Sequence, residues 1–277
     1  MKPSDGDPLD ALQPVRWPPQ LGGAGLVAAA RYAVLLAAGL GRRLGGPKPL
    51  VRLRGRPLAW YPLSVLHLLG VSEACIVTRR ELAGELRGLA ESIYGPGAVD
   101  VVVNEEPWRE NGYSLLLASR GCPGLGWEPV YVSMSDHVYS PLLPARLQPL
   151  PGWAHYGIAG DGDPCCVDVE EATRLQASGG IGYAVGKGLR YWSHVDTGVH
   201  AARPAGLAEE ARRALASGGG VLSLNTLTSG LAARGLLYVA EASGQPWTEI
   251  DTPRDLEEAE KGERRRVVDH VLSWLRC

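Results

Sequence analysis

The sequence predicts an α/β protein with a doubly wound, mostly parallel sheet and a mixed-sheet insertion that faces the substrate. A short, wholly apolar run at residues 33–38 and the mainly apolar runs that follow it are typical of buried parallel strands. Segments with helical spacing alternate with these runs over about the first 140 residues. After that point the alternation stops, and short strand candidates lie between glycines, which predicts the insertion.

The first half supplies four predicted strands, at residues 33–38, 74–78, 99–104 and 129–134. Helices are expected between them at residues 57–69, 81–93 and 111–120. Pro57 suits the first turn of a helix, because its fixed φ is already helical and its missing N–H is not needed there. The helix at 81–93 is indicated by an apolar face of Leu82, Leu86, Leu89 and Ile93.

The insertion is expected at about residues 150–200, with strand candidates AHYGIAG, VDV, GIGYAVG and SHVDTGVH. Later helices are predicted at 205–217 and 222–235, strands at 236–242 and 248–251, and a C-terminal helix at 253–276. We expect one domain over residues 31–277, preceded by a Pro/Gly-rich N-terminal tail at residues 1–30.

Composition excludes several classes of function. The net charge of −2 gives no general reason to bind nucleic acid or an acidic membrane, so any anion site must be local. The best apolar run has ten residues, too few for a membrane span, so we expect a soluble, cytoplasmic protein. The chain has only eight Asn and Gln residues, which suits a thermophile; a GC-rich genome remains an equal explanation of the composition.

The five cysteines form no CxxC pair, which argues against a zinc site. Their odd number and the neighbouring Cys165 and Cys166 favour a reducing compartment, while a disulfide stays open.

The loop after the first predicted strand, in LLAAGLGRRLGGPKPL, is built to hold phosphate groups. Gly39 and Gly41 let backbone N–H groups approach a ligand closely. Arg43 can donate to two phosphate oxygens, and Lys48 is a point charge held between prolines. The loop lacks the sixth-position glycine of the dinucleotide fingerprint and the GK[ST] of a P-loop.

This segment, LAAGLGRRL…PKPL, resembles the signature of the sugar-nucleotidyltransferase superfamily, whose members join a nucleoside triphosphate to a phosphorylated sugar or alcohol and release pyrophosphate. The segments ENGYSLLLA and MSDHVYSP resemble CTP:inositol-1-phosphate cytidylyltransferases of thermophilic archaea and bacteria. The resemblance implies a Rossmann-like domain and a Mg²⁺-dependent enzyme. The enzyme implied by this resemblance would transfer the cytidylyl group of CTP to inositol 1-phosphate for di-myo-inositol phosphate osmolyte synthesis.

The resemblance also implies roles for particular residues. Asp136 and Asp251 each follow or end a predicted strand and would hold Mg²⁺, although capping is the other reading of each. The remaining roles are catalytic for Lys48 and Arg43, nucleotide-binding for Ala38, Gly39, Gly41, Asn111 and Ser114, and acceptor-binding for Lys187 and Asp196. Asn111 could instead cap its own helix, Lys187 could be an exposed loop charge, and Asp196 could form a turn.

Two other functions stay open. One is the same chemistry on phosphocholine or a hexose 1-phosphate, where choline would need an aromatic cage such as Trp153, Tyr156, Tyr183 and Trp192. The other is a non-catalytic nucleotide-binding subunit. Many relatives are fused to a membrane-embedded synthase; this chain ends at Cys277 without a span, so we expect any such partner to be a separate polypeptide.

Overall fold

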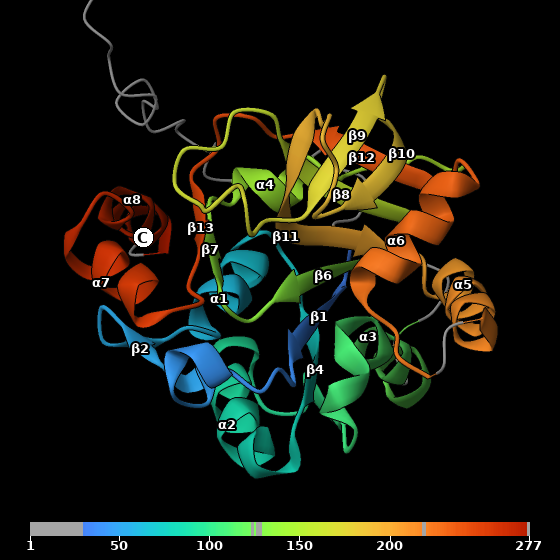
Figure 1. Cartoon of the computed structure of the whole chain (residues 1–277). Helices are drawn as coiled ribbons and strands as arrows, with labels where there is room; N and C mark the ends of the chain where they lie inside the picture. The colour runs from blue at the N-terminus through green and yellow to red at the C-terminus, as the bar shows by residue number, and fades with distance from the viewer. Residues whose placement is uncertain (1–29, 123–124, 126–128, 218–219, 276–277) are drawn as a thin grey trace, which may run out of the picture.

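The computed structural model describes residues 30–122, 125, 129–217 and 220–275, so nearly all of the predicted N-terminal tail lies outside the described residues. A nine-stranded sheet crosses the molecule in the order β5-β4-β1-β6-β11-β8-β12-β10-β9. Helices cover both faces of this sheet (Figure 1). The predicted doubly wound α/β architecture is therefore confirmed in outline.

One half of the sheet is parallel, as the apolar runs predict. It contains β1 (Tyr32–Ala37), β4 (Glu73–Thr78), β5 (Val99–Val103) and β6 (Val130–Met134). β1 is central, with β4 and β6 as its parallel neighbours, and it is almost fully buried. Helices α1 (Trp60–Leu68) and α2 (Ala83–Tyr94) pack on one face of it, and α3 (Glu110–Gly121) packs on the other.

The other half of the sheet is mixed, and this corrects the expectation of a mostly parallel sheet. It contains β8 (Tyr156–Asp161), β9 (Arg174–Ser178), β10 (Ile181–Gly186), β11 (His194–Ala202) and β12 (Leu237–Glu241). Of its pairings, only that of β8 with β12 is parallel. Because β11 pairs directly with β6, the strands expected to form an insertion continue the main sheet.

Several predicted boundaries also change. The first helix begins at Trp60 because Pro57 belongs to β3 (Arg56–Pro57), which pairs with β2 (Arg52–Leu53). The segment VDV at 167–169 forms no strand. The expected helix at 253–276 is two helices, α7 (Pro253–Lys261) and α8 (Arg265–Leu275), because Gly262 adopts an extended conformation between them.

The remaining elements complete the core. Helices α5 (Pro204–Ser217) and α6 (Leu224–Ala233) pack beside α3, and α4 (Leu142–Ala145) is a single turn. Strands β7 (His137–Tyr139) and β13 (Trp247–Glu249) form a separate antiparallel pair, beside which α7 and α8 lie (Figure 1). The described residues also form the short 3-10 turns η1 (Arg42–Leu44), η2 (Lys48–Leu50), η3 (Arg80–Leu82) and η4 (Pro107–Arg109).

A disulfide joins Cys75 in β4 to Cys122 after α3, a pairing that the sequence left open. Cys165 and Cys166 are free. Among the described helices, none has both the length and the apolar character that a bilayer crossing requires.

Helix α3 packs directly against the backbone that precedes α6. A Cβ atom at Gly112 would lie 2.6 Å from the carbonyl oxygen of Ser223 and 2.7 Å from that of Leu222. The next residue, Tyr113, donates its backbone N–H to the Leu222 carbonyl at 2.8 Å. Gly112 is therefore required by the contact between these two segments.

We predict that Gly112→Ala lowers the free energy of unfolding by about 1–3 kcal/mol, since backbone must move to admit the methyl group. Thermal unfolding followed by circular dichroism measures this change. Gly88→Ala is the matched control in α2, because its Cβ atom would meet open space. It should leave stability unchanged or raise it by about 0.5–1 kcal/mol. Equal melting temperatures for the two variants would contradict the packing argument.

Candidate active site

The glycine-rich loop turns back on itself directly after β1. Gly41 has φ +61°, in the left-handed region that favours glycine. A Cβ atom there would collide with the carbonyl oxygen of Gly46 and lie 3.2 Å from the backbone nitrogen of Lys48. The absence of a side chain at position 41 thus allows the loop to bring Lys48 beside the carboxyl end of β1.

Lys48 is the centre of a cluster of opposite charges. Its Nζ lies 2.6 Å from Oδ2 of Asp136 and also donates a hydrogen bond to Oδ1 of Asp251. Arg43 donates from Nη2 to the other oxygen of Asp251 at 2.5 Å. The structure therefore brings the two predicted metal ligands and the two predicted catalytic cations together, although they come from distant parts of the sequence.

The β7–β13 pair explains how the two acids meet. Asp136 directly precedes β7 and Asp251 lies just after β13, and Glu249 is the partner of His137 in the ladder. The backbone N–H of Ile250 also bonds to the Asp136 carbonyl at 3.0 Å. Asp251 is held further by the start of α7, where Thr252 and Asp255 form a capping box, so the capping role that the sequence suggests belongs to these neighbours.

Electrostatics keeps Lys48 and Asp136 charged at neutral pH. Burial alone would lower the pKa of Lys48, but Asp136 and Asp251 raise it to about 12. Burial would raise the pKa of Asp136, yet Lys48 and His137 hold it far below its usual range. Because Asp136 is ionised, Oδ1 accepts a hydrogen bond from Nδ1 of His137 at 2.7 Å, so both carboxylate oxygens of Asp136 have partners.

The carboxylates of Asp136 and Asp251 suit Mg²⁺. Both present oxygen donors to one point, where the Lys48 ammonium shows that a positive charge is stable. Within the described ranges, no three His, Cys, Asp or Glu side chains form a group that could hold a metal by themselves. Mg²⁺ commonly takes only one or two protein carboxylates and fills its other positions with substrate phosphates and water. These residues therefore fit a Mg²⁺ ion that binds together with a phosphorylated substrate.

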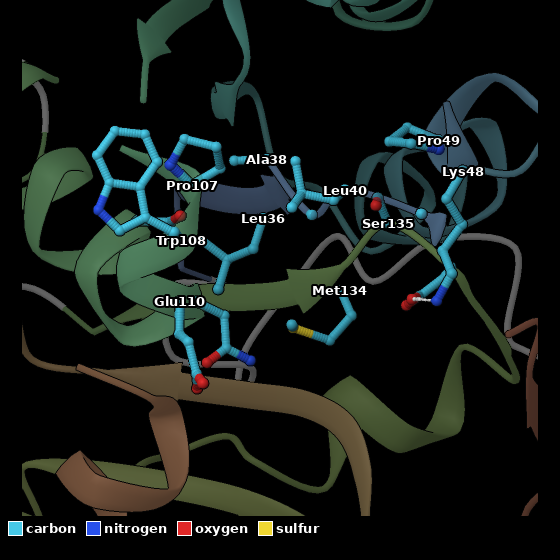
Figure 2. A pocket seen from close by; sticks show the side chains of 15 residues that line it. Leu36, Ala38, Leu40, Lys48, Pro49, Pro107, Trp108, Glu110, Met134 and Ser135 are labelled. Carbon is cyan, nitrogen blue, oxygen red and sulfur yellow. Dashed lines mark hydrogen bonds and ion pairs between the residues drawn. The ribbon is translucent and has the colours of Figure 1, made fainter. Parts of the chain in front are cut away.

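A cavity of about 440 Å³ opens beside this cluster. Figure 2 shows Lys48 at one side of it, Trp108 and Glu110 at the other, and Leu36 and Met134 between them. The predicted nucleotide-binding residues all line this cavity: Ala38, Gly39, Gly41, Asn111 and Ser114. Arg43 lies in an adjoining cleft of about 720 Å³ and reaches the cluster through Asp251.

Asn111 does not cap its own helix, because α3 already begins at Glu110. Its Oδ1 atom instead accepts the backbone N–H of Leu224, the first residue of α6, at 2.8 Å. The amide NH₂ group of Asn111 is then the part available to a ligand.

The two predicted acceptor residues line a third hollow of about 260 Å³, which also includes Glu249 and Asp251. Lys187 is exposed there. Asp196 accepts hydrogen bonds from the backbone of Gly198 and from Nε2 of His200, both at 2.8 Å. Burial would raise the pKa of Asp196, but His200 outweighs burial and lowers it.

Three residues of the site were missed by sequence reasoning. His137 and Glu249 flank the acids, and burial together with Asp251 and Asp136 raises the pKa of Glu249 against the effect of His137. Trp108 lines the cavity with 64% of its surface exposed, which is unusual for tryptophan. The sequence did contain a signal for Trp108, since this large aromatic residue lies in the loop NEEPW that follows the third predicted strand.

Comparisons with known proteins identify similar domains. Residues 33–155 match the model of a MobA-like NTP transferase domain. A protein of Rubrobacter xylanophilus named bifunctional IPC transferase and DIPP synthase is 36% identical over 247 residues, covering 87% of this chain and 52% of the relative. A protein of the same name from Thermococcus kodakarensis is 31% identical over 230 residues, with coverages of 83% and 50%. The chain thus spans about half the length of these relatives.

Among solved structures, the inositol-1-phosphate CTP transferase from T. maritima has a TM-score of 0.75 and 23% identity, covering 88% of this chain and 97% of that one. This likeness concerns the fold. The predicted resemblance to sugar nucleotidyltransferases, and to inositol-1-phosphate cytidylyltransferases in particular, is confirmed by the matched domain model and by the curated relatives.

We predict that Lys48→Ala lowers the free energy of unfolding at pH 7 by about 3 kcal/mol, because it leaves two facing carboxylates without their shared cation. Urea unfolding monitored by fluorescence measures the loss. Lys187→Ala removes an exposed ammonium group and should change stability by less than about 0.5 kcal/mol. A Lys48 variant as stable as the wild type would show that the two carboxylates do not depend on this cation.

Proposed function

We propose that this protein is a Mg²⁺-dependent cytidylyltransferase that converts CTP and inositol 1-phosphate to CDP-inositol and pyrophosphate, for di-myo-inositol phosphate synthesis. The observation that carries the proposal is the contact of Lys48 with both Asp136 and Asp251 beneath the glycine loop. The names of the relatives support the choice of CTP and inositol 1-phosphate. A downstream synthase as a separate partner stays a prediction.

The triphosphate of CTP would lie over the glycine loop. Backbone N–H groups at Gly39 and Gly41 can approach its oxygens, since neither residue has a side chain in the way. Lys48 and Arg43 would neutralise the negative charge that grows on the leaving pyrophosphate. Ala38 lines the same cavity and would contact the nucleotide through its backbone. The base would extend toward α3, where Asn111 and Ser114 line the cavity.

In the proposed reaction, a phosphate oxygen of inositol 1-phosphate attacks the α-phosphorus of CTP in line. The bond from this phosphorus to the oxygen that bridges to the β-phosphate breaks, and pyrophosphate leaves. The attacking phosphate is already ionised at neutral pH, so the protein needs no general base. Its work is to hold two anions at the same place, which requires positioning and cations.

Asp136 and Asp251 would hold the Mg²⁺ ion. When bound, such an ion supplies positive charge to the phosphate oxygens. His137 and Lys48 already fix both oxygens of Asp136, so this carboxylate is oriented before any ligand arrives.

The hollow lined by Lys187 and Asp196 is the proposed acceptor site. It adjoins Asp251, so an acceptor there would lie next to the reacting phosphate. Lys187 would attract the acceptor phosphate, and Asp196 would accept hydrogen bonds from ring hydroxyls. Carboxylates and histidines in the lining suit a polyol such as inositol.

A phosphocholine acceptor is not supported by the aromatic residues that the sequence offered. Tyr156 is fully buried and bonded to His200, and Trp153 packs against Tyr238. Among the residues that line the acceptor hollow, none is aromatic other than histidine. A quaternary ammonium group would therefore lack its cage there.

The proposed function is tested by pyrophosphate release with purified protein, Mg²⁺, and every combination of CTP, UTP, ATP and GTP with inositol 1-phosphate, phosphocholine and glucose 1-phosphate. CTP with inositol 1-phosphate should react fastest, and omission of Mg²⁺ should stop release. Binding of CTP without release for any acceptor would favour the non-catalytic alternative, and a faster reaction with another acceptor would replace inositol 1-phosphate.

We predict that Asp136→Asn and Asp251→Asn each lower kcat for CDP-inositol formation by roughly 100-fold or more, because each removes one anionic oxygen donor from the cation site. Steady-state pyrophosphate release measures the change. Glu85→Gln is the control, since Glu85 is exposed on α2 away from the cavity. Retention of more than a tenth of wild-type kcat by either aspartate variant would exclude its metal-binding role.

We predict that Trp108 stacks on the cytosine ring. The adjacent Arg109 is anchored by a 2.6 Å bond to the Gly220 carbonyl and stacks on Tyr113, so the backbone under Trp108 is held in place. Trp108→Ala should raise KM for CTP roughly tenfold, and Trp108→Phe should recover most of the loss.

KM for inositol 1-phosphate should stay unchanged in both Trp108 variants, because that substrate binds elsewhere. Trp153→Ala is the matched control, a partly exposed tryptophan that packs on Tyr238. An equal effect of the Trp108 and Trp153 substitutions on KM for CTP would contradict stacking.

A further inference from the structure

Two side chains behind the nucleotide cavity form a directed chain of hydrogen bonds. The backbone N–H of Glu106 donates to Oδ1 of Asn104 at 2.8 Å. Nδ2 of Asn104 in turn donates to Oγ of Ser114 at 2.9 Å. A backbone N–H can only donate, so it fixes which end of the amide is oxygen and which is nitrogen.

The two residues that form these hydrogen bonds are buried and held in place. Asn104 is 1% exposed and Ser114 is 3% exposed, so water cannot easily replace either partner. Asn104 follows β5 directly, and its own backbone N–H bonds to the Thr78 carbonyl at the end of β4 at 2.7 Å. Ser114 lies in the second turn of α3 and lines the cavity.

The donor-to-acceptor direction of these hydrogen bonds decides whether Ser114 offers a donor or an acceptor to the cavity. A hydroxyl group has one proton to donate and lone pairs that accept. Here a lone pair of Ser114 is occupied by the amide of Asn104, and no acceptor in the described part of the chain takes the hydroxyl proton. The side chain therefore offers a hydrogen-bond donor to whatever occupies the cavity.

A fixed donor can distinguish the two pyrimidines. Cytosine has an unprotonated N3, which accepts the Ser114 proton. Uracil carries a proton at N3, which Ser114 could accept only with its second lone pair, and the buried proton of Ser114 would then have no acceptor. A buried polar group left without a partner weakens binding far more than a lost favourable contact does.

We propose that Asn104 is a positioning residue that locks the Ser114 hydroxyl as a donor and thereby selects a pyrimidine with an acceptor at N3, cytosine rather than uracil. This inference rests on the proposed function only in assuming that the cavity holds the base of the nucleotide substrate. It assigns the discrimination to a residue that does not touch the ligand.

The first test compares CTP and UTP. Asn104→Asp keeps the acceptor for the Glu106 N–H but replaces the NH₂ donor by an oxygen, so the Ser114 proton turns away from the cavity. The ratio of kcat/KM for CTP to that for UTP should fall roughly tenfold or more. Asn104→Ala frees the hydroxyl to rotate, and should lower the ratio by a smaller factor. Gln176→Ala, which removes an exposed amide in β9, should leave the ratio unchanged.

A double variant separates positioning from a structural role. Ser114→Ala removes the donor and should lower the ratio by itself, and Asn104→Asp should then cause no further change. Unchanged ratios in both Asn104 variants, or an equal additional effect in the Ser114→Ala background, would overturn the proposal. Melting temperatures and circular dichroism establish that the compared variants are folded.

A second measurement needs no variant. The triphosphate of the pyrimidin-2-one ribonucleoside has the N3 acceptor of cytosine but lacks its amino group. Calorimetric titration of the wild-type protein should give a Kd closer to that of CTP than to that of UTP. A Kd equal to that of UTP would assign the selection to the amino group and overturn the role of Ser114 and Asn104.

Failure of the proposed function can be distinguished from failure of the proposed role of Asn104. In that case the wild-type protein would release no pyrophosphate with inositol 1-phosphate, while the preference for CTP over UTP in binding and its dependence on Asn104 would still be measurable. If wild-type turnover is intact and the preference for CTP over UTP is independent of Asn104, only the positioning role of Asn104 is refuted.

Discussion

The arrangement of the site depends on one interaction, the contact of a single ammonium group with two carboxylates from distant segments. Without Lys48, Asp136 and Asp251 would be two like charges in a partly buried place, which is unfavourable. Three separate features make the contact geometrically feasible: the left-handed turn at Gly41, the pairing of β7 with β13, and the capped start of α7. The cavity lies where these features meet the carboxyl edge of the parallel strands, the usual ligand position in open α/β sheets.

The parallel half of the fold could be predicted because its strands are short and mainly apolar, and β1, β4 and β6 are almost fully buried. In the mixed half the sequence predicted strands where β8, β10, β11 and β12 lie, but not their pairing, because the partners are far apart along the chain: β11 pairs with β6, and β8 pairs with β12. No local pattern encodes such pairings. The helix break at Gly262 was missed for a related reason, since the apolar positions on both sides of it continue a helical pattern.

In the candidate site, too, local features could be predicted from the sequence, whereas contacts between distant segments could not. Gly39, Gly41, Arg43 and Lys48 are close in sequence, so their common purpose could be recognised from one segment. Asp136 and Asp251 could be identified because each stands at the end of a strand, but only the β7–β13 pair explains their contact. The sequence offered a cap on α3 as the alternative role of Asn111, whereas its side chain accepts the first N–H of α6, a partner more than a hundred residues later. His137 and Asn104 gave no signal, since a lone histidine or asparagine has many ordinary uses.

A polar site of this kind must be ordered before its ligand arrives, because side chains that reorient during binding would reduce both affinity and selectivity. Here the order comes from groups that do not themselves bind substrate. His137 occupies one oxygen of Asp136, Thr252 and Asp255 cap the helix beside Asp251, and Asn104 occupies a lone pair of Ser114. His137 belongs to the pair β7–β13, Asn104 directly follows strand β5 of the sheet, and Thr252 and Asp255 form the capped start of α7. Under the proposed function, the selectivity of the cavity depends on these supporting groups as well as on the residues that line it.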